Sequence, residues 1–379
     1  MATDFRAKYF SRTQSAFPDE VEILGTTYVK VEDLRYGTNP HQGASFYRPK
    51  DSAGMPFGHM EQLKTGKSGL SETNYGDLNH GANIVKYFDR PACAVMKHMN
   101  PSGAARDGPG YHVPDHRGRL SSVYIRARDA DAVAAFGSTV VFNTELDAET
   151  AKWIMTSVVE VVAAPEIGSE ALEVLSDHAT YKMNKDIRVI RLPNLTSLPK
   201  WVGDPAAPTI KVLADGSLVV AEPLLSRIKS GADLVPASTE HPKRGKLELA
   251  IEKPPTKQQL DDLLFSWYVN LSVRSNGVVI AKNGVTLAIG TGQQDRVAAV
   301  RQAIAKAREK FKGTETLEGS VLSSDGYIPF RDTVDACAEA GIAAIAQPGG
   351  SLRDWESIEA CNEHQISMVF TGERCFSHH

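Results

Sequence analysis

Short runs of small and β-branched apolar residues alternate with helical stretches along this chain, and this alternation is what most constrains its fold. ACAVMKH (92–98) and STVVFN (138–143) have the composition of strands that are buried on both faces. Residues 147–162 place apolar side chains at helical spacing behind Asp147, which can cap a helix, so we predict a helix there. Such alternation predicts an α/β fold in which helices are layered on a sheet.

The chain has 379 residues, which is enough for two packed lobes. We predict a first lobe over 1–195 and a second over 257–379. Prolines punctuate 196–256, which is interpreted as an ordered, irregular connector containing a hairpin at 210–222. In the second lobe we predict helices over 257–275, 296–311 and 331–340. We also predict a hairpin turn at Asn283-Gly284 and strands over 342–347 and 366–370.

The two predicted lobes share one short sequence similarity. ACAVMKHMNPSGAA (92–105) and IAAIAQPGGSLRD (342–354) each lead from a small-residue strand into Pro, a small residue and Gly. The similarity fits an internal duplication, and it equally fits two unrelated strand-to-helix turns. The sequence alone leaves both interpretations open.

Composition excludes several classes of protein. The formal net charge of −4 argues against a nucleic-acid partner, because phosphate-binding domains of that kind are usually basic. No window approaches the roughly 20 apolar residues that cross a membrane, and the first ten residues contain no apolar segment typical of a secretory signal. The four cysteines have no CxxC spacing, so neither a disulfide framework nor a zinc site is predicted. We therefore expect a cytoplasmic enzyme.

Two motifs in the first lobe carry residues suited to catalysis or anion binding. LRYGTNPHQ (34–42) places Arg35 and Tyr36 before a bend, and the planar guanidinium of Arg suits a phosphate, although a structural ion pair is the alternative. Lys97 and His98 follow a buried strand, where α/β proteins bind ligands. The pair combines a cation with a group that titrates near neutral pH, although a His at a strand end is often only hydrogen-bonded.

Three more groups of motifs lie in the second lobe. RSNG (274–277) and GTGQQDR (290–296) form glycine-rich turns, the second at the start of a helix, where backbone N–H groups can bind anions. SSDGYIPFRD (323–332) contains an aromatic-Pro-aromatic segment that suits a flat heterocycle, with core packing as the alternative. The last is PGGS (348–351) together with the basic, aromatic tail from Arg374 to His379.

Taken in order, these motifs together with AFG (135–137) and QPGGS (347–351) resemble the transformylase part of the bifunctional purine-synthesis enzymes, the AICAR transformylase/IMP cyclohydrolase family. AICAR is aminoimidazole carboxamide ribonucleotide. The resemblance extends from about residue 24 to the end of the chain. What precedes Leu34 is too short for the family's cyclohydrolase domain, so we expect a stand-alone transformylase and a separate IMP cyclohydrolase in the cell.

The resemblance implies formyl transfer from 10-formyltetrahydrofolate to the 5-amino group of AICAR, within purine (IMP) synthesis. It assigns His98 as the general base, Lys97 as its cationic partner and Asn276 as a catalytic residue beside the amine. Further residues are implied by motif. The substrate-binding set is Arg35, Tyr36, Asn74, Gly137, Glu160 and Arg374. The set on the folate side is Arg296, Asp325, Tyr327, Pro329, Phe330 and Ser351.

The resemblance also implies two cytidine-deaminase-like lobes, layered α/β/α, and a homodimer with active sites at the subunit interface. The resemblance also suggests a structural potassium ion. We assign no residue to a metal and expect no zinc. His59 and Glu61 fit H-x-E without the accompanying P-C-x-x-C, which disfavours a zinc deaminase. The sequence is also compatible with a non-catalytic nucleotide- or folate-binding paralogue and with a formyltransferase that acts on a related amino-nucleotide.

Overall fold

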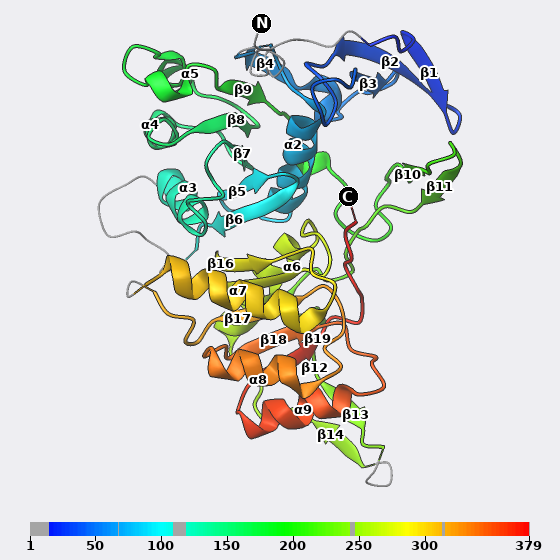
Figure 1. Cartoon of the computed structure of the whole chain (residues 1–379), viewed down its shortest axis with the longest axis vertical. Helices are drawn as coiled ribbons and strands as arrows, with labels where there is room; N and C mark the ends of the chain where they lie inside the picture. Colours follow the sequence, from blue (N-terminus) through cyan, green and yellow to red (C-terminus); the bar gives the residue numbers. More distant parts are fainter. Residues whose placement is uncertain (1–14, 67, 109–118, 243–246, 313–314, 379) are drawn as a thin grey trace, which may run out of the picture. The chain divides into compact units, whose positions relative to one another are not determined.

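The structure is a computed structural model that describes residues 15–66, 68–108, 119–242, 247–312 and 315–378 (Figure 1). The N-terminal residues, over which we predicted no signal segment, and His379 lie outside these ranges. The chain divides into two compact units, unit 1 over residues 1–198 and unit 2 over residues 199–379.

Unit 1 is built on a mixed β-sheet with the strand order β6-β5-β7-β8-β9-β4. The hairpin β5–β6 pairs through β5 with β7 in antiparallel fashion, β7, β8 and β9 run parallel, and β4 is antiparallel at the edge. The strands are β4 (Glu61–Lys64), β5 (Ala92–Lys97), β6 (Asn100–Arg106), β7 (Ser138–Phe142), β8 (Val159–Ala164) and β9 (Arg188–Arg191).

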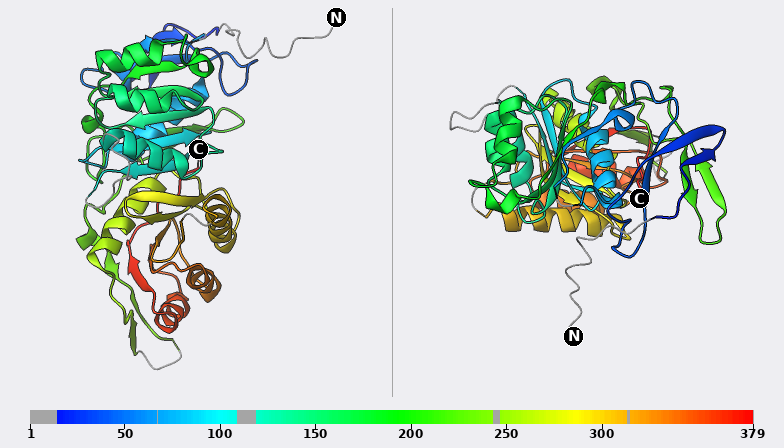
Figure 2. Two further views of the ribbon diagram at one scale, coloured as in Figure 1. Left: turned by 90° about the vertical axis from the view of Figure 1, so that its left-hand side faces the viewer. Right: turned by 90° about the horizontal axis from the view of Figure 1, so that it is seen from above.

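Helices cover both faces of this sheet (Figures 1 and 2). Helix α2 (Glu72–Val85) packs on one face against β5 and β7, and α3 (Arg119–Asp129), α4 (Ala148–Ile154) and α5 (Ser169–Ser176) stack along the other. The predicted layering of helices on a sheet is therefore confirmed for unit 1. A separate antiparallel sheet of β1 (Glu20–Ile23), β2 (Thr26–Asp33) and β3 (Ser45–Pro49) precedes it in the chain.

Unit 2 is built on a sheet with the strand order β12-β19-β18-β17-β15-β16. Here β15 pairs antiparallel with β16 and β17, the strands β17, β18 and β19 run parallel, and β12 is antiparallel at the edge. The strands are β12 (Val235–Pro236), β15 (Val278–Lys282), β16 (Val285–Gly290), β17 (Val321–Ser324), β18 (Ala344–Gln347) and β19 (Ser367–Phe370).

Helix α6 (Lys257–Asn270) packs against β15 and β17 in unit 2. The helices α7 (Arg296–Lys310), α8 (Arg331–Glu339) and α9 (Asp354–Glu363) lie side by side in a row, α7 against α8 and α8 against α9 (Figure 1). Two small hairpins complete the unit, β10 (Thr209–Val212) with β11 (Leu218–Ala221), and β13 (Ser238–Glu240) with β14 (Glu248–Ala250). In the described ranges no helix has the length and apolar character needed to span a membrane.

Around their main sheets the two units repeat one order of elements: an edge strand, a helix, a hairpin, and then three helix–strand pairs. In unit 2 the small hairpin β13–β14 is inserted between the edge strand and the helix. This repetition supports an internal duplication of the fold. The sequence similarity that suggested a duplication nevertheless compares the wrong segments. Residues 92–105 form the hairpin β5–β6, whose counterpart is β15–β16, whereas residues 342–354 contain β18 and the loop after it.

The predicted helix over 147–162 is wrong beyond Ile154. Asp147 caps α4 as predicted, accepting a hydrogen bond from the backbone N–H of Thr150 at 2.7 Å. The following valines form β8 instead, between the parallel strands β7 and β9. Valine favours strands when both faces are covered, and a β-branched run cannot be distinguished from a helix by spacing alone. Glu160 is therefore a strand residue.

The other elements predicted from local sequence are confirmed to within a few residues. These are the strands at 92–98 and 138–143, the hairpin at 210–222, the helices starting at 257, 296 and 331, and the strands ending at 347 and 370. The helix predicted over 257–275 ends at Asn270, so its last five predicted residues are not helical. Asn283-Gly284 forms the predicted turn, with φ of 55° and 65°. The connector assignment of 196–256 stays a prediction, and its residues from Pro199 onward belong to unit 2.

Candidate active site

A polar pocket of about 530 Å³ in unit 1 contains most of the residues that the sequence singled out there. It is formed by the loop after β2, the start of α2 and the end of β5, together with Gly137, which directly precedes β7, and Glu160, which lies in β8. Its lining residues are Arg35, Tyr36, Thr38, Asn39, Ser71, Thr73, Asn74, Asp77, Lys97, His98, Gly137 and Glu160.

The loop after β2 presents a buried guanidinium to the pocket. The loop is closed by a hydrogen bond from the N–H of Gly37 to the carbonyl of Gln42 at 2.7 Å, and the N–H of Arg35 bonds the carbonyl of Leu70 at 2.9 Å. Arg35 is only 8% exposed, lies 4.5 Å from the centre of the Tyr36 ring, and has no hydrogen-bond partner for Nε among the described residues. A buried donor of this kind is costly unless a ligand satisfies it, and an anion does so best.

Asn74 is fixed by the cap of α2. Its side-chain oxygen accepts hydrogen bonds from the backbone N–H and the hydroxyl of Ser71, each at 3.1 Å, and its own N–H bonds the Ser71 hydroxyl at 3.3 Å. This is a capping box, which satisfies two N–H groups at the start of the helix. The amide oxygen is occupied, so Asn74 offers a ligand its amide nitrogen, a hydrogen-bond donor.

Lys97 and His98 lie at the end of β5. The ammonium of Lys97 donates to the carbonyl of Gly137 at 2.7 Å. Gly137 has a φ of 69°, and a Cβ built on it would lie 3.1 Å from Lys97 Nζ and 3.7 Å from Glu160 Oε1. Glycine at this position thus lets the cation and the carboxylate approach the same side of the pocket. His98 is exposed and has a φ of 53°, uncommon for a residue with a side chain.

Asp77 also belongs to the pocket, although it lies in none of the motifs described above. Its carboxylate accepts hydrogen bonds from the N–H of Met99 at 2.6 Å and from the Thr139 hydroxyl at 3.3 Å. Burial raises the pKa of Asp77 to about 6, and these hydrogen bonds, together with the nearby His98 and Lys97, only partly oppose it. Its position three residues after Asn74 on one helix face was the signal that could have identified it.

This raised pKa predicts a stability that depends on pH. An unfolded Asp titrates near pH 4 and the folded one near 6, so between these values the native state holds a proton that the unfolded state has lost. The free energy of unfolding should therefore fall as the pH rises through this window, by about 3 kcal/mol relative to Asp77→Asn, and then level off. Urea denaturation of both proteins across this range measures it, and a constant difference between them would contradict it.

Arg188 is a second residue that the sequence analysis missed. It begins β9, is 4% exposed, and donates from Nε to the carbonyl of Gly69 at 2.7 Å. The pKa of Arg188 is lowered. Burial is the largest cause and the nearby Arg35 the next, while Glu160 partly opposes the shift. Two buried guanidiniums therefore influence one another on this side of unit 1. The only sequence signal was that Arg188 directly precedes the apolar pair Val189-Ile190.

The second-lobe residues predicted for catalysis or folate binding belong to unit 2. The amide nitrogen of Asn276 donates to the carbonyl of Gln293 at 2.8 Å, which leaves its amide oxygen as an acceptor for a ligand. Next to it, Gly277 donates its N–H to Asp325 at 2.8 Å and accepts a hydrogen bond from Arg296 at 3.1 Å. Arg296 and Asp325 also form an ion pair, and Asp325 is fully buried. The pair thus supports the turn that carries Asn276.

The two aromatic residues of the segment 323–332, Tyr327 and Phe330, are exposed, which excludes the core-packing alternative for them within this chain. Tyr327 is 40% and Phe330 48% exposed, while Ile328 between them is buried and Pro329 is half-buried. The guanidinium of Arg374 lies 6.0 Å from the centre of the Tyr327 ring and 4.8 Å from that of Phe376. Arg374 is therefore grouped with the aromatic residues of unit 2, while Arg35 and Tyr36 belong to unit 1.

The PGGS loop lies close to this aromatic group. A Cβ on Gly350 would be 4.0 Å from the Tyr327 ring, and Gly350 and Ser351 both donate their N–H groups to Asp354, at 2.7 and 3.0 Å. The Ser351 hydroxyl accepts a hydrogen bond from the N–H of Arg353 at 3.2 Å. Asp354 thus holds the loop that carries Ser351.

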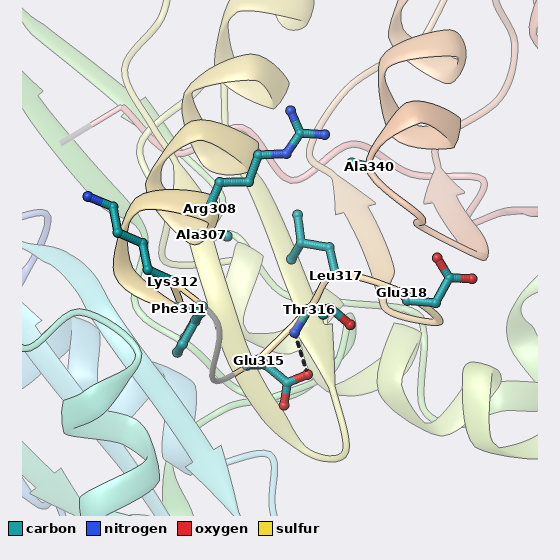
Figure 3. Close-up of a pocket in the computed structure, with 9 residues that line it drawn as sticks. All are labelled: Ala307, Arg308, Phe311, Lys312, Glu315, Thr316, Leu317, Glu318 and Ala340. Carbon is teal, nitrogen blue, oxygen red and sulfur yellow. Dashed lines mark hydrogen bonds between the residues drawn. The ribbon is translucent and has the colours of Figure 1, made fainter.

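A further pocket of about 380 Å³ lies at the end of α7 (Figure 3). It contains two cations, Arg308 and Lys312, and two carboxylates, Glu315 and Glu318. Glu315 pairs with Lys282 at 3.1 Å. These charges balance and no adjacent acid–base pair lies among its residues, so this pocket is a weaker candidate. Across the described ranges, no three His, Cys, Asp or Glu residues gather in a way that could hold a metal ion.

The fold and the unit 1 pocket together define an α/β protein that can hold a small anionic ligand beside an adjacent Lys–His pair. Over residues 4–306 the sequence matches the family described as "AICARFT/IMPCHase bienzyme". This match covers most of the chain, and the chain belongs to that family.

Two proteins named "Bifunctional purine biosynthesis protein PurH" illustrate the similarity. The protein from Clostridium perfringens (strain 13 / Type A) is 39% identical over 357 residues, which are 94% of this chain and 61% of that protein. The protein from Xanthomonas oryzae pv. oryzae (strain MAFF 311018) is 38% identical over 367 residues, covering 97% and 61%. The chain thus spans about 61% of the length of these curated relatives.

A solved structure of a diaminohydroxyphosphoribosylaminopyrimidine deaminase/5-amino-6-(5-phosphoribosylamino)uracil reductase from Thermotoga maritima also matches part of the chain. The TM-score is 0.21 and the identity 24%, over 26% of this chain and 31% of that one. A similarity this slight says nothing about the fold.

Proposed function

We propose that this protein transfers a formyl group from 10-formyltetrahydrofolate to the 5-amino group of AICAR, giving formyl-AICAR for purine synthesis. The observation that carries the proposal is the unit 1 pocket, where the buried guanidinium of Arg35 and the amide of Asn74 lie with Lys97 and His98. An anionic nucleotide supplies the acceptors that these donors need. Membership of the family supports the choice of reaction.

The unit 1 residues are proposed to bind AICAR. Arg35, with Tyr36 beside it, holds the phosphate. Asn74 donates its amide to an oxygen of the substrate, and Glu160 accepts a hydrogen bond from a substrate N–H. Gly137 keeps the space between Lys97 and Glu160 open.

Catalysis requires proton transfer because the amine of AICAR is conjugated with an electron-poor ring and is a weak nucleophile. The amine nitrogen attacks the formyl carbon and His98 takes the amine proton. His98 then donates this proton to the folate nitrogen as the bond from that nitrogen to the formyl carbon breaks. The ammonium of Lys97 stabilises the negative charge that develops on the formyl oxygen. The amide oxygen of Asn276 accepts a hydrogen bond from the amine and orients its lone pair.

Unit 2 is proposed to bind the folate. Tyr327, Pro329 and Phe330 form an exposed surface suited to a flat ring, with Ser351 contributing a polar contact. Arg296 and Asp325 complete this side, and their ion pair positions the turn that holds Asn276. Arg374 is the exception among these unit 2 residues, because it is proposed as a second group on the nucleotide phosphate in addition to Arg35.

The remaining predictions of the sequence analysis also stay proposals. They are the cytidine-deaminase-like character of the two lobes, a homodimer with shared active sites, the cytoplasmic location, the structural potassium ion and the separate IMP cyclohydrolase. The element order that the two units repeat is consistent with paired lobes of one fold.

The proposed function is tested by following folate absorbance when the purified protein meets AICAR and 10-formyltetrahydrofolate. We expect tetrahydrofolate release that depends on both compounds. The AICAR nucleoside, which lacks the phosphate, serves as the control acceptor and should react far more slowly. Binding of both compounds without release would overturn the proposal in favour of a non-catalytic paralogue or a different acceptor.

A further inference from the structure

The hairpins β5–β6 and β15–β16 hold the same place in the two units, and two residues close each of them. His98-Met99 closes the first, with φ of 53° and 62°, and Asn283-Gly284 closes the second, with φ of 55° and 65°. Positive φ at both central positions is the pattern of the type I′ hairpin turn, which strongly favours Asn-Gly.

The two turns therefore share a backbone and differ in how well their sequences suit it. Gly284 adopts a positive φ without steric cost, and Asn283 is among the residues that tolerate it best. Met99 has a long side chain at the position where Gly is preferred. A residue with a side chain stays in this conformation only when its surroundings hold it there.

A buried aspartate contacts each turn from the preceding helix. Asp262 lies six residues after the N-cap of α6 and accepts hydrogen bonds from the N–H groups of Asn283 and Gly284, at 2.9 and 2.8 Å. Asp77 lies six residues after the N-cap of α2 and accepts the N–H of Met99 at 2.6 Å. The two carboxylates are 3% and 5% exposed, so the duplicated fold repeats this anchor at both turns.

Two further contacts tie the first turn to its surroundings. The second oxygen of Asp77 accepts the Thr139 hydroxyl at 3.3 Å, so the carboxylate links α2, the turn and β7. The side chain of Met99 lies against Gly76, where an added Cβ would be 2.7 Å from Met99 Sδ. Helix α2 thus holds Met99 by its backbone through Asp77 and by its side chain at Gly76.

We propose that Asp77 is a positioning residue, which holds the His98-Met99 turn in its left-handed conformation and so fixes the imidazole of His98 at the pocket. The inference rests on the proposed function, in which His98 is the base. Unit 2 closes the same turn with residues that adopt it readily, and there the anchor contributes only to the fold. In unit 1 the anchor allows a His to occupy a position that local preference would give to Asn.

Variants at both turns test this proposal in the formyl-transfer assay. Asp77→Ala should lower kcat by about 100-fold, the loss expected from a misplaced catalytic group, with little change in the KM for AICAR. Asp77→Asn keeps an oxygen that can accept the Met99 N–H and should retain most of kcat. Adding Met99→Gly to Asp77→Ala should restore about tenfold or more, because Gly adopts the turn unaided. The matched control, Asp262→Ala, should lower stability and leave kcat unchanged.

A measurement that needs no catalysis separates this inference from the proposed function. The amide of Met99 should be protected from hydrogen exchange in the wild type and lose its protection in Asp77→Ala. A wild-type kcat in Asp77→Ala, or no recovery on adding Met99→Gly, would overturn the inference while leaving the proposed function intact. If Asp77→Ala does not fold, an unprotected Met99 amide in the wild type overturns it instead. A wild type that binds both substrates but transfers no formyl group would overturn the proposed function.

Discussion

Replacing His98 by Ala should lower kcat for formyl transfer by about 1,000-fold, with little change in the KM for AICAR. A positioned general base typically contributes about 100- to 10,000-fold, and the weak nucleophilicity of the AICAR amine places the requirement in the middle of that range. The KM should change little because the buried donors of the pocket, Arg35 and Asn74, remain. The effect should therefore fall on the chemical step.

Single-turnover rates at saturating concentrations of both substrates measure this effect without interference from product release. His178→Ala is the matched control, since His178 is an exposed histidine of unit 1 outside the pocket and should leave the rate unchanged. A His98→Ala rate within about threefold of the wild type would assign the base to another group, because even a modest general base contributes more than that.

The parts of this site that could be predicted from sequence are those fixed by local geometry. Lys97 and His98 were located because a buried apolar run ends at them, and the structure ends β5 at Lys97. Outside the site, the turn at Asn283-Gly284 and the helix cap at Asp147 were also predictable from local sequence. Each depends on a few neighbouring residues whose backbone preferences are strong.

The parts that could not be predicted depend on contacts between segments distant in sequence. Asp77 meets Met99 across 22 residues, and Arg188 meets the carbonyl of Gly69 across 119. Apart from its spacing three residues after Asn74, nothing in the sequence around Asp77 distinguishes it from an exposed helix carboxylate. The strand at Val159–Ala164 was missed because its burial between two parallel strands, and not its local pattern, determines its conformation.

The ion pair of Arg296 and Asp325 shows a third limit. Each residue was selected from its own motif as a ligand contact, and the motifs lie far apart in the chain. In the structure they contact one another and Gly277, so much of their charge is satisfied within the protein. A motif identifies residues that belong to a site, and the fold determines whether they touch a ligand or support one that does.

Arg35→Met should raise the KM for AICAR by about 100-fold, with a smaller effect on kcat. Removing one partner of a buried, charge-assisted contact costs about 2–5 kcal/mol, and 100-fold corresponds to about 2.7 kcal/mol. Methionine keeps much of the side-chain bulk beside Tyr36, so packing of the loop should survive. Isothermal titration with AICAR measures the loss of affinity directly.

The same variant distinguishes phosphate binding from a structural role for Arg35. With the AICAR nucleoside as ligand, which has no phosphate, the wild type and Arg35→Met should bind almost equally. Arg191→Met is the matched control, because Arg191 lies on β9 outside the pocket and pairs instead with Glu61 and Glu166. An equal loss of affinity for nucleotide and nucleoside would mean that Arg35 supports the loop between β2 and α2, and phosphate binding would then be assigned to other groups, such as Arg374.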